Sequence, residues 1–484
     1  METNTLKNKA LKGVFWKLLE NFGTQGIAFI VTLVIARFIM PEDYGIIAIV
    51  TVFISIADVF VVGGFATALI QNKDVTDDDY SSVFILNFSV AVVLYGVIFL
   101  SAPMIAEFYN NPALSLVLRV LALKLLPGSL NAIQIAMLSK ELQYNKLFAR
   151  NIISGIPSGI IGIIMAYFGL GVWALVGQQL SAIVLSCIAF FFACKWRPRF
   201  VFKFDRIKIL FSFGWKLLTS NLLNTLYNNI RTLIIGKLYN PATVGYYNKG
   251  HQIPNYLCIS LDGAIQSVMF STYSKVQDDK EMVKSIMRRT IKTSSYIIFP
   301  FMLGMAACAS PFVSFALTDK WLPCVPFMQI FCFSYCLMPI HTANLQAINA
   351  MGRSDIFLKL EIIKKVIGVT VLLASVPFGV YPMAVSMAGV SVVNSFVNAY
   401  PNKKLLGYTY IEQIKDMIPN LIGALLMFGI VILLANINLP KILILIIQVL
   451  SGVVIYLLYS ILTKSESFNY ILDIIKSFLK KEGK

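Results

Sequence analysis

The stretch Trp16–Gly45, WKLLENFGTQGIAFIVTLVIARFIMPEDYG, returns about two hundred positions later as Trp215–Gly245, WKLLTSNLLNTLYNNIRTLIIGKLYNPATVG. Both copies open with Trp-Lys-Leu-Leu, share an internal Thr-Leu and close on Pro-x-x-x-Gly. The offset is 199 at the tryptophans and 200 at the final glycines, which corresponds to one inserted residue. The order of these matches indicates an internal duplication.

The composition surrounding this repeat is that of a membrane protein. The 484 residues are 57% hydrophobic and 13% charged, with a mean hydropathy of +0.75. Apolar runs of about eighteen residues or more predict a polytopic α-helical membrane protein and exclude a β-barrel of short alternating strands. We expect fourteen membrane helices, approximately at 13–38, 44–68, 82–106, 114–138, 148–168, 172–194, 209–238, 244–271, 293–317, 324–350, 357–376, 380–399, 416–436 and 441–462.

The basic residues predict the orientation of these helices. If the N-terminus is cytoplasmic, the inner segments hold 31 of the 41 Lys and Arg residues, and the outer connections hold four. Such a bias predicts a multi-pass membrane protein with both termini in the cytoplasm. The net charge of +17 therefore indicates topology and contact with anionic membrane lipids, and no nucleic-acid partner is expected.

The repeat also predicts the domain organisation. Helices 1–6 pair with helices 7–12, giving an N-terminal lobe at 1–208 and a C-terminal lobe at 209–400. Residues 401–484 add two helices and a basic amphipathic tail. Six spans return the chain to its starting side, so the copies share an orientation, as in transporters built from parallel repeats.

Each copy carries a polar face on its first helix. In the first helix Lys17 and Glu20 begin a stripe that continues through Asn21, Thr24 and Gln25. In the seventh helix Lys216 begins the corresponding stripe, which Thr219, Ser220, Asn224, Asn228 and Arg231 extend. Charges at the bilayer centre cost about 2.5–3.5 kcal/mol on insertion scales, so we expect these faces to line an aqueous cavity. A lysine that only anchors the helix at the interface is the alternative for each copy.

Other intramembrane charges are functional candidates by the same reasoning. Arg119 and Lys124 lie within helix 4, and Asp58 and Asp262 lie within helices 2 and 8. We expect Lys17, Arg119, Lys124, Lys216 and Arg231 to form a cationic substrate site. Glu20, Asp58 and Asp262 are candidates for coupling to an ion, with a structural salt bridge as the alternative. Two distant histidines give no metal cluster, and we expect no catalytic residues.

Three polar segments outside the spans have local interpretations. The acidic run TDDDY at Thr76–Tyr80 predicts a helix start with Thr76 as N-cap. The bases Lys280, Lys284, Arg288 and Lys292 recur every four residues, and we interpret them as a helix lying on the inner leaflet. The tail YILDIIKSFLKK receives the same interpretation.

Several segments together resemble a known family: ARFIMPEDYGIIAI (Ala36–Ile49), GGFATALIQ (Gly63–Gln71), WRPRFVFKFDRIKILFSFG (Trp196–Gly214), IIGKLYNPATVGYYNKG (Ile234–Gly250) and GRSDIFLKLE (Gly352–Glu361). In this order they resemble the polysaccharide-transport branch of the multidrug/oligosaccharidyl-lipid/polysaccharide exporter superfamily, and most of all its colanic-acid and teichuronic-acid subgroup. The resemblance implies two six-helix lobes in a V with helices 13 and 14 outside. It carries no individual substrate residue over to this chain.

The resemblance also implies a function. Such proteins flip undecaprenyl-pyrophosphate-linked oligosaccharide from the cytoplasmic to the outer leaflet by alternating access. The lipid-linked oligosaccharide is then the main partner, with a polysaccharide polymerase as a further candidate partner and a monomer as the simplest assembly. No cofactor is expected, and H⁺ or Na⁺ is the candidate coupling ion.

Three other functions fit the sequence less well. A cation-coupled multidrug exporter of the same superfamily would need an acidic, aromatic cavity, whereas this sequence places more bases than acids within its helices. A membrane glycosyltransferase would need substantial outer loops, and only the pair Glu42-Asp43 invites that interpretation. A membrane scaffold without transport would not need repeated charged faces.

Overall fold

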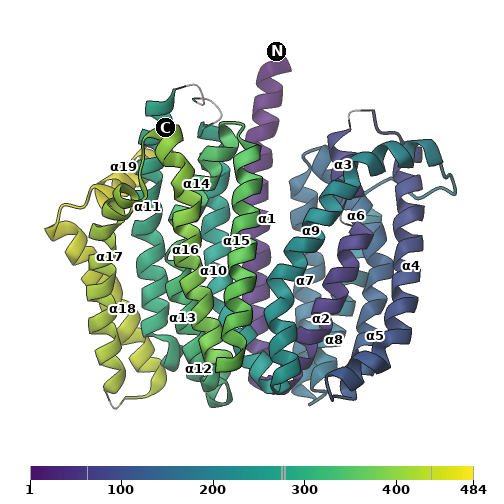
Figure 1. Ribbon diagram of the computed structural model, residues 1–484, viewed down its shortest axis with the longest axis horizontal. Helices are drawn as coiled ribbons and strands as arrows, with labels where there is room; N and C mark the ends of the chain where they lie inside the picture. Colours follow the sequence, from purple (N-terminus) through teal and green to yellow (C-terminus); the bar gives the residue numbers. More distant parts are fainter. Residues whose placement is uncertain are drawn as a thin grey trace. The chain divides into compact units, whose positions relative to one another are not determined.

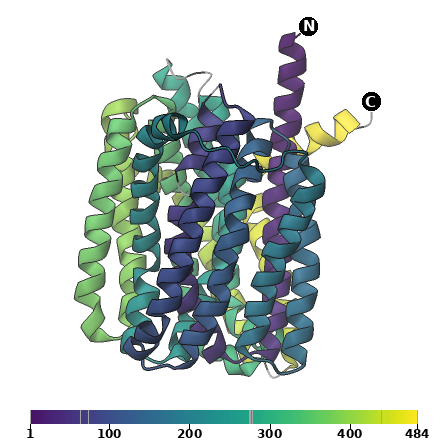
Figure 2. The same cartoon turned by 90° about the vertical axis from the view of Figure 1, so that its right-hand side faces the viewer.

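The computed structural model describes residues 2–62, 64–72, 74–273, 276, 279–437 and 439–482, and every regular element within these ranges is a helix. The chain divides into two compact units, Met1–Asn248 and Lys249–Lys484. In each unit the long helices run side by side (Figures 1 and 2). The lobes expected at 1–208 and 209–400 and the appendage at 401–484 follow the sequence repeat, and they stay a prediction.

The first unit contains the helices of the first repeat and the first long helix of the second. They are α1 (Glu2–Phe38), α2 (Pro41–Val62), α3 (Phe65–Gln71), α4 (Asp77–Phe108), α5 (Ala113–Leu121), α6 (Leu125–Lys140), α7 (Tyr144–Tyr167), α8 (Val172–Ala193) and α9 (Phe204–Leu238). A single 3-10 turn at Ala122–Lys124 separates α5 from α6. Helix α10 (Pro241–Tyr273) begins in the first unit and continues into the second.

The second unit contains the remaining helices. They are α11 (Lys280–Ala307), α12 (Ala309–Leu317), α13 (Val325–Tyr335), α14 (Met338–Ala350), α15 (Ser354–Ser375), α16 (Val380–Leu406), α17 (Tyr410–Leu433), α18 (Lys441–Leu462) and α19 (Glu466–Glu482). Helices α11 and α12 meet at a bend of 69°, and α14 is bent by 40° from the segment before it. Pro339 at the start of α14 has no N–H to continue the preceding helix, which accounts for the second break.

The structure confirms the expected class, an all-helical integral membrane protein. Each of the fourteen predicted spans falls on one helix or on consecutive helices of the observed order. Among the described residues, nine helices are long and apolar enough to cross a membrane, and eleven spans result if each bent pair counts as one. The chain is therefore a multi-pass protein, and the count of fourteen stays a prediction.

The two Pro-x-x-x-Gly copies contact each other where α2 and α10 begin. A Cβ atom on Gly45 would lie 1.7 Å from the carbonyl oxygen of Pro241, and one on Gly245 would lie 2.1 Å from that of Pro41. Only residues without a side chain permit this approach, because real Cβ contacts are not closer than about 3.0 Å. The repeated glycines are thus explained by one reciprocal helix crossing.

A second glycine pair joins the other end of α2 to α9. The residue between α2 and α3, Gly64, faces Gly214, and a Cβ on Gly64 would lie 2.3 Å from the Gly214 carbonyl oxygen. Backbone therefore packs directly on backbone near both ends of α2. These two contacts fix how α9, which carries the second polar stripe, lies along the first repeat.

The acidic run after α3 begins α4 as predicted. The Thr76 side chain accepts a hydrogen bond from the Asp79 backbone N–H, and the Asp79 carboxylate accepts one from the Thr76 backbone N–H. This reciprocal capping box satisfies two N–H groups that the first turn of a helix leaves without partners. The N-cap interpretation of Thr76 is confirmed.

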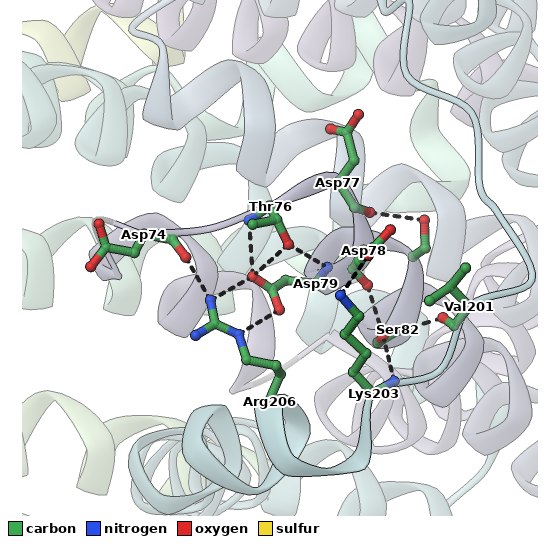
Figure 3. A network of polar contacts seen from close by, with 10 residues as sticks. Asp74, Thr76, Asp77, Asp78, Asp79, Ser82, Val201, Lys203 and Arg206 are labelled. Carbon is green, nitrogen blue, oxygen red and sulfur yellow. Dashed lines mark hydrogen bonds and ion pairs between the residues drawn. The ribbon is translucent and has the colours of Figure 1, made fainter.

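The same acidic run also fastens the connection between α8 and α9 (Figure 3). Arg206 donates two hydrogen bonds to Asp79, from Nε to Oδ1 at 2.9 Å and from Nη2 to Oδ2 at 2.8 Å. Lys203 pairs with Asp78 at 2.6 Å, and its backbone N–H donates to the Ser82 hydroxyl at 3.0 Å. The connection that leads from the first repeat into the second is therefore clamped to the start of α4.

The basic stripe has a different role from the one expected. Lys284, Arg288 and Lys292 belong to the first half of α11, a continuous helix of 28 residues, and do not form a separate surface helix. Lys284 donates to the Gly407 carbonyl at 2.9 Å, and Arg288 pairs with Asp416 at 2.7 Å. Charged side chains at four-residue spacing serve membrane surfaces and helix contacts equally well, so the pattern alone could not separate them.

Candidate functional site

The first unit contains an open cavity of about 520 Å³, lined by both polar and apolar residues. It lies among α2, α6, α7, α8 and the middle of α9, so it joins helices of the first repeat to the first helix of the second. Its lining is made up of Ser55, Asp58, Val59, Val62, Gly128, Asn131, Ala132, Ile135, Arg150, Ile183, Asn221, Asn224, Thr225 and Asn228. The lining thus combines one base, one acid and four asparagines, and contains no aromatic residue.

Arg150 is the base of this cavity. It lies in the second turn of α7, and its guanidinium sits over the ring of Phe190 from α8, 4.9 Å from the centroid. Its Nε atom is buried and has no hydrogen-bond partner within the described part of the chain. A guanidinium with an unused donor beside a cavity is suited to bind the oxygens of a phosphate. This role could not be predicted from the sequence, because Arg150 lies in a stretch with the composition of an inner basic loop.

Asparagines supply the uncharged polar wall. Asn131 of α6 donates to the Ser186 hydroxyl at 3.0 Å, and its carbonyl oxygen accepts from the Cys187 thiol at 3.2 Å, so α8 fixes its orientation. Asn224 and Asn228 are one turn apart on α9 and both line the cavity. These two belong to the polar stripe predicted for this helix. Amide groups offer both donors and acceptors, which matches the hydroxyl groups of a sugar.

The acid of the cavity is Asp58 on α2. Lys124, in the turn between α5 and α6, interacts electrostatically with it. The structure therefore brings together two of the predicted residues, one acid and one base.

Glu20 lies beside the cavity rather than in its lining. Asn151 of α7 donates to the Glu20 carboxylate at 3.3 Å and to the Thr24 hydroxyl at 2.9 Å. Glu20 also interacts electrostatically with Arg150. The polar face predicted for the first helix thus packs on α7, next to the cavity arginine.

The remaining predicted bases lie elsewhere. Arg231 is buried on α9, one turn beyond Asn228, with its guanidinium 5.6 Å from the centroid of the Tyr227 ring. Arg119 donates to the Phe99 carbonyl at 3.0 Å and covers the ring of that residue, which directs it to α4. Lys216 is exposed on α9 and is not among the lining residues. The side chain of Lys17 lies outside the described residues.

Asp262 belongs to a separate polar cluster in the second unit. It is 5% exposed on α10 and accepts hydrogen bonds from the Thr342 hydroxyl and from the Gln266 amide, the latter at 2.6 Å. Gln346 extends the cluster by donating to Gln266 at 3.2 Å. Among the described side chains, which do not include that of Lys17, no Lys or Arg pairs with Asp262, and the salt bridge expected as the alternative stays a prediction.

Known protein sequences match this chain over most of its length. The pattern of the polysaccharide biosynthesis protein family matches residues 34–326, more than half of the chain. The lipopolysaccharide biosynthesis protein WzxC of Escherichia coli (strain K12) is 23% identical over 417 residues, which cover 85% of each chain. The teichuronic acid biosynthesis protein TuaB of Bacillus subtilis (strain 168) is 28% identical over 301 residues, 60% of this chain and 61% of TuaB.

Solved structures share the fold. The lipid II flippase MurJ in an inward closed conformation matches with a TM-score of 0.75 at 15% identity, covering 93% of this chain and 99% of MurJ. An inward-facing multidrug resistance transporter of the MATE family matches with a TM-score of 0.59 at 12% identity, covering 82% and 94%. The chain thus belongs to the polysaccharide biosynthesis protein family, in the polysaccharide-transport branch of the multidrug/oligosaccharidyl-lipid/polysaccharide exporter superfamily.

Proposed function

We propose that this protein is a flippase that moves undecaprenyl-pyrophosphate-linked oligosaccharide from the cytoplasmic to the outer leaflet of the bacterial cytoplasmic membrane. Relatives named for lipopolysaccharide and teichuronic acid biosynthesis, and the fold shared with a lipid II flippase, support this assignment. The observation that carries it is the cavity that Arg150 lines together with four asparagines.

The substrate head fits the chemistry of this cavity in two parts. The pyrophosphate is held by Arg150, because a guanidinium binds phosphate oxygens through charge-assisted hydrogen bonds that persist in a low-dielectric site. The sugar hydroxyls are held by Asn131, Asn224 and Asn228. Lys124 and Arg231 add positive potential near the cavity and attract the head during entry. The polyprenyl tail remains in the lipid.

A multidrug exporter of the same superfamily is the alternative. A site for organic cations needs acidic and aromatic groups, because ring faces and carboxylates attract positive charge. The cavity lining offers one carboxylate against one guanidinium and no ring. Four asparagines and the absence of a ring from this lining therefore favour a hydroxyl-rich substrate over an organic cation.

The cycle also needs a driving force, for which we propose ion coupling at Asp262. The Thr342 hydroxyl and the Gln266 amide nitrogen donate hydrogen bonds to its carboxylate, which no base within the described residues neutralises. A carboxylate oxygen is a ligand for Na⁺ and an acceptor for a proton, so Asp262 suits either coupling ion. Glu20 and Asp58, which lie near bases, are the secondary candidates.

The test compares lipid-linked sugars in cells that lack the protein. We expect one undecaprenyl-pyrophosphate oligosaccharide to accumulate facing the cytoplasm, detected by leaflet-selective labelling and mass spectrometry. Unchanged lipid-linked sugars combined with a higher sensitivity to cationic drugs would instead support the exporter.

Complementation then tests the cavity itself. Arg150→Gln removes the charged hydrogen bonds to the pyrophosphate, which are worth about 1.5–3 kcal/mol. The transport rate at low substrate concentration should therefore fall about 10- to 100-fold. Arg150→Lys should retain part of the activity. Arg199→Gln removes the same charge from an exposed position and serves as the control. Wild-type transport by Arg150→Gln at normal protein level would remove this cavity from the mechanism.

A further inference from the structure

One end of the second unit gathers basic side chains around a second, smaller pocket. The pocket has a volume of about 210 Å³ and lies among α11, α17, α18 and the link to α19. Its charged lining residues are Lys292, Lys464, Asp416 and Glu466. Helix α19 follows directly and turns away from the direction of α18 (Figure 2). The pocket therefore lies where a membrane helix gives way to an amphipathic one.

Asp416 does not contribute free negative charge to this pocket. It pairs with Arg288 at 2.7 Å and accepts a hydrogen bond from the Tyr408 hydroxyl at 2.7 Å. Lys292 approaches its other oxygen only to 3.9 Å. With Asp416 neutralised by Arg288, the pocket holds Lys292 and Lys464 against one remaining acid, Glu466.

That remaining acid is held weakly. Glu466 contacts Lys292 at 2.7 Å, but its side chain is 76% exposed, whereas that of Lys292 is 26% exposed. Exposed ion pairs are worth about 0–1 kcal/mol, because water screens the charges and both side chains lose freedom. A more strongly bound anion could therefore replace the Glu466 carboxylate on the Lys292 ammonium group.

The surroundings of the pocket indicate where such an anion comes from. Leu458, Ile461 and Leu462 on the last turns of α18 are 53%, 57% and 81% exposed. On a helix apolar enough to span a membrane, these side chains face acyl chains. These side chains lie on the face of α18 opposite Tyr456 and Ser460, which line the pocket, and the span ends at Leu462. The pocket therefore lies at the end of the span, at the depth of lipid phosphates, with Lys464 and the hydroxyls of Ser465 and Ser467 around Lys292.

We propose that this pocket binds the phosphate of an anionic membrane lipid, and that Glu466 occupies the phosphate position when no lipid is bound. Lipid binding displaces Glu466 from Lys292 and so removes one of the contacts that hold α19 on α11. Two further contacts between α11 and α19 are the Arg289 guanidinium over the Tyr470 ring at 5.1 Å and the packing of the Tyr296 ring on that of Phe468. This pocket shares no lining residue with the cavity that Arg150 lines in the first unit. Its proposed lipid ligand therefore does not depend on which substrate the protein transports.

Two substitutions should change lipid binding in opposite directions. Lys292→Gln removes the phosphate ligand and should weaken binding at least tenfold, while Arg288 still neutralises Asp416 and preserves the fold. Glu466→Gln removes the competing carboxylate and should tighten binding severalfold. Lys280→Gln and Glu281→Gln change the same charges at exposed positions near the start of α11 and should change binding by less than twofold.

The measurement uses the purified full chain in detergent, titrated with dihexanoyl phosphatidylglycerol, with phosphatidylcholine of the same chain length and with inorganic phosphate. Thermal stabilisation as a function of concentration gives the apparent affinity. Phosphatidylglycerol should stabilise the protein at the lowest concentration, and the two pocket variants should shift its curve in opposite directions. Equal affinity for inorganic phosphate, or pocket variants that behave as their controls do, would overturn the proposal.

Discussion

The reciprocal crossing of α2 and α10 gives a quantitative prediction. In Gly45→Ala the new Cβ would lie 1.7 Å from the Pro241 oxygen, so the two backbones must separate by at least 1.3 Å to reach the 3.0 Å floor of real contacts. A gap of about 0.5–1 Å between packed atoms already removes a quarter to a half of their dispersion attraction. An extra methyl group in a packed interface typically lowers stability by about 1–3 kcal/mol. Alanine recovers up to about 1 kcal/mol of helix propensity.

We therefore expect Gly45→Ala to destabilise the first unit by about 1–2 kcal/mol. At roughly 2–4 °C per kcal/mol for a domain of this size, the melting temperature falls by several degrees. Thermal unfolding of the purified protein in detergent measures this shift. The matched control is Gly96→Ala within α4, where a Cβ would meet nothing within 4 Å, and which should be neutral or stabilising.

The double variant tests the geometry more stringently. Gly245→Ala alone should also destabilise, because its Cβ would lie 2.1 Å from the Pro41 oxygen. Since one separation of the two helices relieves both clashes, the double variant should cost clearly less than the sum of the single ones. Additive effects, or a Gly45→Ala protein that melts with the wild type, would refute the reasoning.

Three further predictions follow from particular contacts. Arg206→Gln should lower the melting temperature more than Lys203→Gln, because it leaves Asp79, whose side chain is 2% exposed, without its partner, whereas the other pair is largely solvated; equal shifts would argue against the clamp. Asp262→Asn should abolish the dependence of transport on a Na⁺ or proton gradient in proteoliposomes while the protein still folds, and an unchanged gradient dependence would exclude this residue from coupling. Buried Asn344 of α14 donates a hydrogen bond to Gln413 and accepts one from Asn402, both at 2.7 Å. Asn344→Leu removes both bonds and should therefore destabilise the second unit by about 2–4 kcal/mol in thermal unfolding, and a shift under 1 kcal/mol would contradict the importance of these bonds.

Hydropathy and local capping could be predicted from the sequence because they depend on neighbouring residues alone. All fourteen apolar runs coincide with helices, and the N-cap at Thr76 could be predicted from the run TDDDY. The second polar stripe also indicated Asn224 and Asn228, which do line a cavity. These features need no knowledge of which helices become neighbours.

The residues that depend on helix neighbours escaped prediction. Arg150 resembled an inner-loop charge, since only the packing of α7 against α8 places it over Phe190 beside the cavity. Arg119 resembled a cavity base, yet the packing of α5 against α4 places its guanidinium on the ring and carbonyl of Phe99. The basic stripe of α11 resembled a helix lying on the inner leaflet, whereas Arg288 of this stripe pairs with Asp416 of α17.

The α2–α10 crossing also has an evolutionary consequence. Each glycine receives the other segment's proline carbonyl, so the contact has the form of an isologous interface between two equal partners. Two separate copies of a six-helix ancestor could make this contact with a single Pro-x-x-x-Gly sequence, and any substitution there would be felt twice. Once both copies stood in one polypeptide, each side could change alone. The residues between proline and glycine have done so, becoming Glu-Asp-Tyr in one copy and Ala-Thr-Val in the other, while the glycines remained in both.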